Sequence, residues 1–182
     1  MVKDLYVMDM PQMKSPSGKA LLKEEYKRFA AKLEAVSGKK ITVESLKKGV
    51  DIVNAKRAAV KRLTDLRAAD PAPISGLDAL LVNQVFFYDD PIRFTASVNA
   101  LCDELEDRVK KGAGVFAKGT PRVLVSGCPM AVPNWKLPML IESSGAVIVG
   151  EESCVGERGA RWMTEAKADS VEGLLDQITD RY

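Results

Sequence analysis

Cysteines are the residues of this chain best suited to chemistry, because the sequence contains no histidine. Histidine is the commonest general base and transition-metal ligand, so acid–base chemistry would fall to carboxylates, lysine, tyrosine or cysteine. The three thiols, Cys102, Cys128 and Cys154, are widely spaced and include no CxxC pair. This spacing excludes the usual zinc-ribbon and dithiol motifs, and three thiols are one short of a complete four-thiolate cluster site.

Cys154 lies in a polar, acidic loop, which is a poor environment for an inert core thiol. Glu151 and Glu152 precede it and Arg158 follows it. An arginine nearby stabilises a thiolate, whereas neighbouring glutamates raise the thiol pKa. A thiolate could bind iron or another soft metal, and the spacing alone leaves this ligand or redox role and a structural role equally open.

The other two thiols lie in surroundings more typical of structural cysteines. Gly127 and Pro129 flank Cys128 and fit a tight bend, so we expect Cys128 to be a small apolar filler that shapes the turn, with a ligand role as the alternative. Cys102 lies between Leu101 and Leu105 on a predicted helix, and we expect it in the core.

A further candidate site is the segment Asn134-Trp135-Lys136, at the start of a predicted helix. The first backbone N–H groups of a helix are free to meet an anion, Trp135 could flank a planar ligand, and Lys136 could pair with a phosphate or carboxylate. In the alternative, Trp135 packs against the helical block and Lys136 is solvated.

The elements that position these residues form one βαβ unit. Apolar, β-branched runs predict strands at residues 123–125 and 146–149, and a helix at residues 134–144 connects them. Such a connection brings the second strand back parallel to the first, and ligands bind where loops leave the carboxyl ends of the strands. Cys128 and Cys154 each follow one of these ends.

Helical periodicity dominates the rest of the chain, and the predicted fold class is α/β. We expect an entry strand and loop at residues 1–14, a helical block at 15–118 and a Rossmann-like half-domain at 119–182. Leu5–Val7 could supply a further strand. An apolar stripe at helical spacing predicts the first helix, and it consists of Leu22, Tyr26, Phe29, Leu33 and Val36. N-cap signals predict three further helix starts, at Thr42, at Ser75 with Asp78, and at Ser170. Asp90-Pro91 predicts another, because proline suits the first helical position.

Composition narrows the possible partners. The 27 basic and 25 acidic residues give a net charge of +2, too little field to hold nucleic acid. No apolar run approaches the length of a membrane span and no secretory signal is visible, so we expect a cytoplasmic protein. The basic residues of the second helix, including Lys56 and Arg57, are interpreted as a solvated face, with a phosphate or partner surface as the alternative.

The region around Cys154 resembles the D-component family of 2-hydroxyacyl-CoA dehydratases, which includes benzoyl-CoA reductase subunits, and is most similar to its double-cubane-cluster branch. The resemblance covers nearly the whole chain, in the order VMDMPQMKS, SGKKITVESLKKGVDIVNAKRAAVKRLTDLR, DPAPISGLDAL and PRVLVSGCPMAVPNWKLPMLIESSGAVIVGEESCVGERG.

The resemblance implies Rossmann-like domains with a helical part, and an oxygen-sensitive iron–sulfur cluster held by cysteines. It further implies an ATP-dependent activator protein that delivers single electrons, an acyl-CoA or other small substrate, and a homo- or heterodimer. Family chains are about twice as long, so this chain is expected to be the middle of a larger protein. Cys154, in EESC, matches a cluster cysteine, and Cys128 is a weaker candidate. Glu151, Glu152 and Arg158 would tune the site.

Two functions follow as hypotheses. The leading one is a domain of an iron–sulfur dehydratase or reductase, inactive alone, in which Cys154 binds the cluster. The alternative is a non-catalytic α/β module that binds a ligand or partner without metal.

Overall fold

The computed structural model describes residues 5–130 and 133–181. Contacts divide the chain into two compact units, one formed by Met1–Asp51 with Thr164–Tyr182 and the other by Ile52–Met163. Helix α2 (Val43–Leu66) contributes residues to both. The boundaries expected at residues 14 and 118 do not coincide with this division and stay a prediction.

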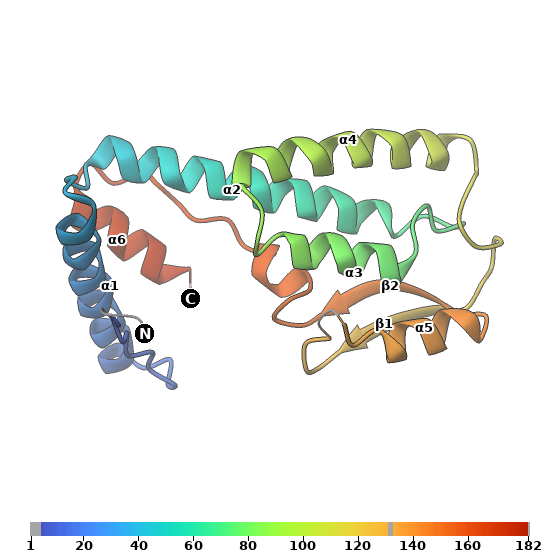
Figure 1. Cartoon of the computed structure of the whole chain (residues 1–182), viewed down its shortest axis with the longest axis horizontal. Helices are drawn as coiled ribbons and strands as arrows, with labels where there is room; N and C mark the ends of the chain where they lie inside the picture. Colours follow the sequence, from blue (N-terminus) through green and yellow to red (C-terminus); the bar gives the residue numbers. More distant parts are fainter. Residues whose placement is uncertain (1–4, 131–132, 182) are drawn as a thin grey trace. The chain divides into compact units, whose positions relative to one another are not determined.

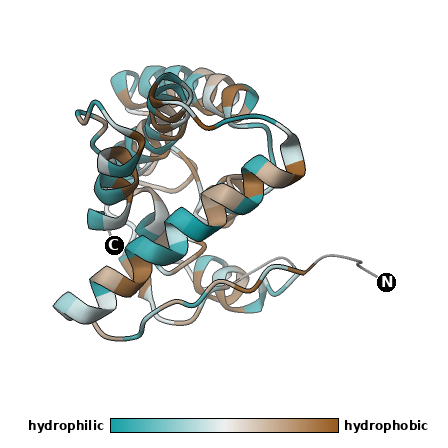
Figure 2. Ribbon diagram, turned by 90° about the vertical axis from the view of Figure 1, so that its left-hand side faces the viewer, coloured by the Kyte–Doolittle hydropathy of each residue, from teal (hydrophilic) through white to brown (hydrophobic). Residues whose placement is uncertain are grey.

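The first unit contains the long helix α1 (Pro16–Ser37). The helix begins where Ser15 accepts a hydrogen bond from the backbone N–H of Gly18, and it ends at Gly38, whose φ of 67° suits the left-handed conformation. Apolar and polar residues alternate along α1, the diagonal helix in front in Figure 2. The predicted stripe is only partly buried, since Leu22 is buried and Leu33 is exposed.

Helix α6 (Val171–Asp180) packs antiparallel against α1. Ser170 caps it as predicted, accepting from the N–H of Gly173. Three ion pairs join the two helices, and the residue numbers rise along α1 while they fall along α6: Lys19–Asp180 at 2.6 Å, Lys23–Asp176 at 3.0 Å and Lys27–Glu172 at 2.6 Å. The last helix therefore pairs with the first helix of the chain.

The predicted strand at Leu5–Val7 is not a strand in the structure, and it does not join the sheet. Leu5 and Val7 are exposed, and the ring of Tyr6 lies 5.6 Å from that of Phe29 on α1. This segment therefore contacts α1 through an aromatic side chain and does not form the backbone hydrogen bonds with a neighbouring strand that a β-strand needs.

The second unit combines helices with a parallel two-stranded sheet (Figure 1). Ser75 caps α3 as predicted, because its Oγ accepts from the N–H of Asp78 at 3.0 Å. The Asp78 carboxylate accepts from the Ser75 hydroxyl at 2.7 Å, where a capping box would have it accept from the Ser75 backbone N–H. The elements that follow α2 in this unit are α3 (Gly76–Val85), α4 (Pro91–Lys110), β1 (Arg122–Ser126), α5 (Lys136–Ser143), β2 (Val147–Glu152) and the short 3₁₀ helix η1 (Glu157–Ala160).

The sheet confirms the predicted βαβ unit. Strands β1 and β2 are parallel, Arg122 pairs with Val147 and Ser126 pairs with Glu152, with one irregularity after Val123. Helix α5 begins two residues later than the predicted start at 134. Pro138 has no N–H for the carbonyl of residue 134, so the helix forms with Pro138 in its first turn, where that N–H is not needed.

The core of this unit lies between α2, α4 and η1. Its buried side chains are Ala59, Val60, Leu63, Ile74, Phe94, Val98, Cys102, Leu105 and Ala160. Cys102 is fully buried as expected, and this burial raises its thiol pKa.

The interpretation of the basic residues of α2 as a solvated face is wrong for two of them. Lys56 and Arg57 are buried. The Lys56 ammonium lies 4.3 Å from the ring centre of Phe86 and 5.1 Å from that of Phe94, and it donates to the Phe86 carbonyl. Burial lowers the pKa of Lys56. Aromatic faces attract a cation, so the aliphatic stem and charged end of Lys56 both become part of the packing.

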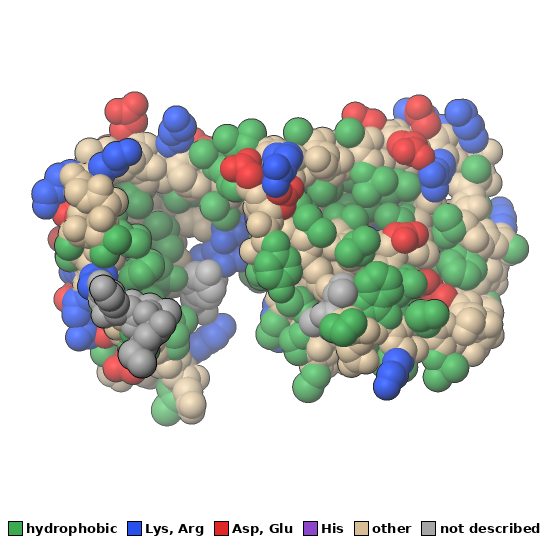
Figure 3. Space-filling model, viewed as in Figure 1, with side chains coloured by type: hydrophobic (Ala, Val, Ile, Leu, Met, Phe, Trp, Pro, Cys, Tyr) green, Lys and Arg blue, Asp and Glu red, His purple; other side chains and the backbone are tan. Residues whose placement is uncertain are grey.

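Hydrophobic side chains also gather on the face of this unit shown in Figure 3. The exposed apolar residues of the unit include Leu124 from β1 and Met139 and Leu140 from α5. Within residues 5–130 and 133–181, no helix is long and apolar enough to cross a membrane.

Candidate functional site

The candidate site is the pair of loops that leave the carboxyl ends of β1 and β2. Ser126 and Glu152 are paired across the sheet, so Cys128 and Cys154 each lie two residues beyond the same pair. The N–H of Gly127 donates to the Glu152 carbonyl at 3.3 Å, and its φ of 133° favours glycine at this turn. The parallel register thus brings both thiol-bearing loops to one edge.

Both thiols are exposed. The expectation that Cys128 is a buried apolar filler is therefore wrong, because the chain turns after β1 at the edge of the sheet, where no further element covers the loop among the described residues. Nearby, Met130 is buried, and its carbonyl accepts from the side-chain amide of Gln84 at 2.9 Å. Helix α3 thus holds the loop through residue 130 and leaves Cys128 in solvent.

Arg158 connects Cys154 to the end of the sheet. Its Nε and Nη2 each lie 2.6 Å from an oxygen of Glu152, and its Nη1 lies 3.5 Å from Cys154 Sγ. Ser126 Oγ lies 3.2 Å from the Glu152 carboxylate. The two hydrogen bonds from Arg158 hold the pKa of Glu152 below its ordinary value, and Glu152 raises the pKa of Arg158. The guanidinium therefore stays charged beside the thiol.

Glu151 faces the opposite way from Glu152, as alternation along a strand requires. It is buried, and Ser153 Oγ donates to its carboxylate at 3.0 Å. Burial raises the pKa of Glu151, although the bond from Ser153 and the charge of Arg67 oppose that effect. Of the two glutamates predicted to tune the site, the structure places Glu152 beside Arg158 and Glu151 in the interior.

The loop that carries Cys154 is anchored at both sides. Before η1, the N–H of Gly156 donates to the Ser153 carbonyl at 3.2 Å, and a Cβ at Gly156 would overlap the Glu151 carbonyl oxygen. At the end of η1, Ala160 belongs to the core. Cys154 is thus an exposed thiol on a short, firmly held loop.

A cavity of about 210 Å³ lies beside this loop. Three cationic and three acidic side chains line it, together with one hydroxyl and one methyl group. The cations are Lys61, Arg158 and Arg161, the acids are Asp65, Glu152 and Glu157, and Thr64 and Ala160 complete the lining. Such a lining suits a polar ligand that carries both donors and acceptors.

The predicted segment at the start of α5 lies mostly in solvent. Asn134 and Lys136 are exposed, and Trp135 is half-buried as the residue that precedes α5. Its indole N–H is buried and has no acceptor among the described residues. No described contact joins these three residues to Cys154 or Arg158.

The ligand set for a metal centre is incomplete in the part of the chain that the structure describes. No three His, Cys, Asp or Glu residues converge there to hold a metal ion. Iron–sulfur clusters usually take four thiolates, and only two exposed thiols, Cys128 and Cys154, lie at this edge. These residues do not form a cluster site by themselves, although an exposed thiol on a fixed loop could contribute one ligand.

Sequence analysis did not identify Arg67, which binds the Cys154 loop through Glu157 at 2.9 Å. The sequence does contain a signal for its burial, because Arg67 lies at helical spacing from the apolar residues Val60 and Leu63. An arginine on an apolar stripe indicates a buried charge that needs a partner, but its partner lies 90 residues away.

Comparison with known proteins assigns the chain to a family. The model of the family described as 2-hydroxyglutaryl-CoA dehydratase, D-component, matches residues 1–182. A putative dehydratase subunit, YjiM, of Escherichia coli strain K12 is 28% identical over 186 residues, which cover 99% of this chain and 46% of that protein.

The (R)-phenyllactyl-CoA dehydratase beta subunit of Clostridium sporogenes is 28% identical over 171 residues, covering 92% of this chain and 43% of that subunit. The chain thus spans less than half the length of either relative. With the family model matching from the first residue to the last, the chain belongs to the 2-hydroxyglutaryl-CoA dehydratase D-component family.

Proposed function

We propose that this chain is the part of an iron–sulfur 2-hydroxyacyl-CoA dehydratase or related reductase in which Cys154 supplies one ligand to the cluster. The observation that carries the proposal is the placement of Cys154: an exposed thiol at the carboxyl end of a parallel strand, 3.5 Å from the Arg158 guanidinium. Membership of the dehydratase D-component family supports the same role.

The remaining ligands would come from residues outside this chain, with Cys128 as the second candidate within it. When bound, such a cluster supplies single-electron chemistry to the substrate. Arg158 would hold the Cys154 side chain in place through its contact with the sulfur, and Glu152 would fix Arg158 by accepting two hydrogen bonds. Glu151, which is buried, would keep the end of β2 packed.

The partners and substrate belong to the proposal as well. A cluster that acts by single electrons needs a donor, which we propose to be an ATP-dependent iron–sulfur activator protein. The substrate would be an acyl-CoA or another small molecule, and the complete protein would act as a homo- or heterodimer in the cytoplasm. The relative from Clostridium sporogenes, named for phenyllactyl-CoA and as a beta subunit, supports the substrate class and a partner subunit.

The test is anaerobic reconstitution of the protein expressed from its own gene, with iron and sulfide. We expect bound iron and sulfide and a broad visible absorbance, all reduced in Cys154→Ala. Cys102→Ala, which removes a buried core thiol, is the matched control and should retain the iron. Cys128→Ala decides whether the second exposed thiol is also a ligand, and iron content per chain distinguishes a single cubane from a double cubane. Full iron content in Cys154→Ala would remove Cys154 from the site.

A second candidate function is a module that binds a ligand or partner without metal. The cavity beside the Cys154 loop favours it, because its polar lining could hold part of a small molecule. Calorimetric titration of the metal-free chain with an acyl-CoA separates the two candidates. A binding module must bind alone, whereas a cluster domain that lacks its other ligands need not.

A further inference from the structure

Arg67 is the least exposed charged side chain at the end of α2, with 2% of its side-chain surface accessible. It directly follows the helix, and its N–H still bonds to the carbonyls of Leu63 and Thr64. A guanidinium does not lose its proton under ordinary conditions, so this position holds a buried positive charge. Burial lowers the pKa of Arg67, opposed by the charge of Glu157.

The side chain of Arg67 joins two elements at the candidate site. Its Nη1 donates to Glu157 Oε1 at 2.9 Å, and its Nη2 donates to the carbonyl of Ile148 on β2 at 2.9 Å. Glu157 is the first residue of η1, and burial raises its pKa while the charge of Arg67 opposes this. Arg67 thus fixes the loop to the strand that precedes it.

A second arginine, on β1, binds the backbone at the end of α2. Arg122, the first residue of β1, donates through Nη2 to the Arg67 carbonyl at 2.9 Å and through Nη1 to the Ala69 carbonyl at 2.7 Å. The end of α2 is therefore bound to β1 through Arg122 and to β2 and η1 through Arg67. These contacts leave little freedom for Arg67 to move relative to the sheet.

The path from Arg67 to the thiol is short. Glu157 is followed directly by Arg158, whose guanidinium contacts Cys154 Sγ. We expect a displacement of Glu157 to shift the backbone of Arg158 and to weaken the contact with Cys154 Sγ, although Glu152 still binds the Arg158 guanidinium. Lysine cannot replace Arg67, because a single ammonium does not reproduce the two directed donors that reach Glu157 and Ile148.

We infer that Arg67 is a positioning residue for Cys154, acting through Glu157 and Arg158. The inference rests on the function proposed for Cys154, and it assigns to the end of α2 the task of holding the ligand loop. It predicts that loss of Arg67 loosens the Cys154 loop without any change at the loop itself.

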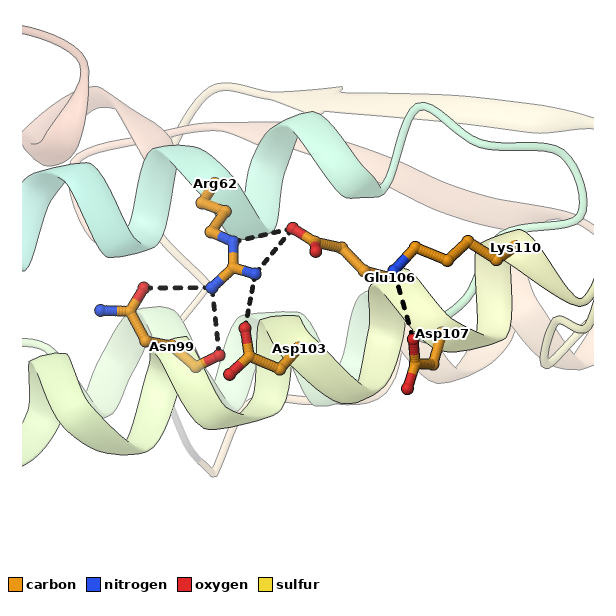
Figure 4. A network of polar contacts seen from close by, with 6 residues as sticks. All are labelled: Arg62, Asn99, Asp103, Glu106, Asp107 and Lys110. Atoms are coloured by element: carbon orange, nitrogen blue, oxygen red, sulfur yellow. Dashed lines mark hydrogen bonds and ion pairs between the residues drawn. The ribbon is translucent and has the colours of Figure 1, made fainter.

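The test is a nitroxide spin label on Cys154 in a Cys128→Ser background, where buried Cys102 does not react. In Arg67→Met, we expect the electron paramagnetic resonance spectrum to show label motion faster by about twofold or more, because a released loop moves on the nanosecond timescale. The matched control is Arg62→Met. Arg62 lies five residues earlier and pairs with Asp103 and Glu106 on α4 (Figure 4). None of these partners belongs to the Cys154 loop, so the loss of Arg62 should leave the spectrum unchanged.

Two variants distinguish the loss of loop positioning from the loss of stability that an unpaired buried charge causes. Arg67→Met leaves Glu157 without its cation, whereas Arg67→Met with Glu157→Gln removes both charges, which commonly recovers stability. We expect the double variant to regain stability but to keep the faster label motion. If Arg67→Met does not fold, Glu157→Ala is expected to mobilise the label in the same way.

An unchanged spectrum in a folded Arg67 variant, or recovery of the parent spectrum in the double variant, would overturn the inference. The label reports on the loop in the absence of iron, so this outcome is independent of whether Cys154 binds a cluster. Failure of the proposed function would instead appear as full iron content in Cys154→Ala.

Discussion

Glu142, near the end of α5, offers a sharp test of how the βαβ unit is held together. Its Oε1 accepts from the N–H of Gly76 at 2.7 Å and from that of Ile148 at 3.2 Å, and Oε2 lies 3.4 Å from the N–H of Leu77. One carboxylate thus caps α3 and binds the start of β2. The perturbation is Glu142→Ala.

The expected loss follows from the number and exposure of these bonds. A hydrogen bond to a charged group contributes about 1.5–3 kcal/mol, and a helix cap contributes about 1 kcal/mol. Glu142 is half-buried, so in the variant water can bind some of the N–H groups that lose the carboxylate. The total loss of stability is therefore well below the sum of the separate hydrogen-bond contributions. We expect Glu142→Ala to lower the free energy of unfolding by about 2–3 kcal/mol, and Glu142→Gln, which keeps one acceptor oxygen, by about half as much.

The assay is chemical denaturation followed by tryptophan fluorescence. The sequence has 2 tryptophans, and both Trp135 and Trp162 belong to the unit that contains Glu142. Glu104→Ala is the matched control, because Glu104 forms an exposed ion pair with Arg108 on α4 and its loss should cost less than about 0.5 kcal/mol. If Glu142→Ala costs no more than Glu104→Ala, the capping role of Glu142 is refuted.

Two further predictions concern the core and a buried carboxyl group. Leu105→Ala should lower the free energy of unfolding by about 2–5 kcal/mol, because Leu105 is only 1% exposed and its truncation leaves a cavity; a loss under about 1 kcal/mol would contradict the packing. Burial raises the pKa of Glu151 in the folded chain, so the folded state binds the proton more tightly and stability falls as pH rises above the unfolded pKa. Glu151→Gln lacks this slope, so its stability relative to the parent should increase from about pH 4 to about pH 7; a constant difference over that range would contradict the buried position.

Local signals were sufficient to predict much of the fold. The strands of the βαβ unit and the caps at Ser75 and Ser170 are encoded by a few neighbouring residues, and the structure confirms them. The strand expected at Leu5–Val7 failed because a strand needs a partner, and partner choice is not a local property. The surroundings of Lys56 were predicted wrongly because its aromatic partners are distant in sequence, Phe86 just after α3 and Phe94 on α4.

The candidate site could be predicted only in part for the same reason. Cys154, Glu152 and Arg158 are close in sequence, so their network was within reach of sequence reasoning. The exposure of Cys128 depends on which elements cover the sheet edge, and the contact between Arg67 and Glu157 joins distant segments. Both depend on tertiary packing.

The most direct test of the role proposed for Cys154 is the position of iron in the protein purified and crystallised without oxygen. Anomalous scattering measured at the iron absorption edge locates iron without reference to activity. We expect an iron peak within bonding distance of Cys154 Sγ, at the carboxyl end of β2. Iron that lies elsewhere in the same crystals, with the Cys154 sulfur unbound, would contradict the account.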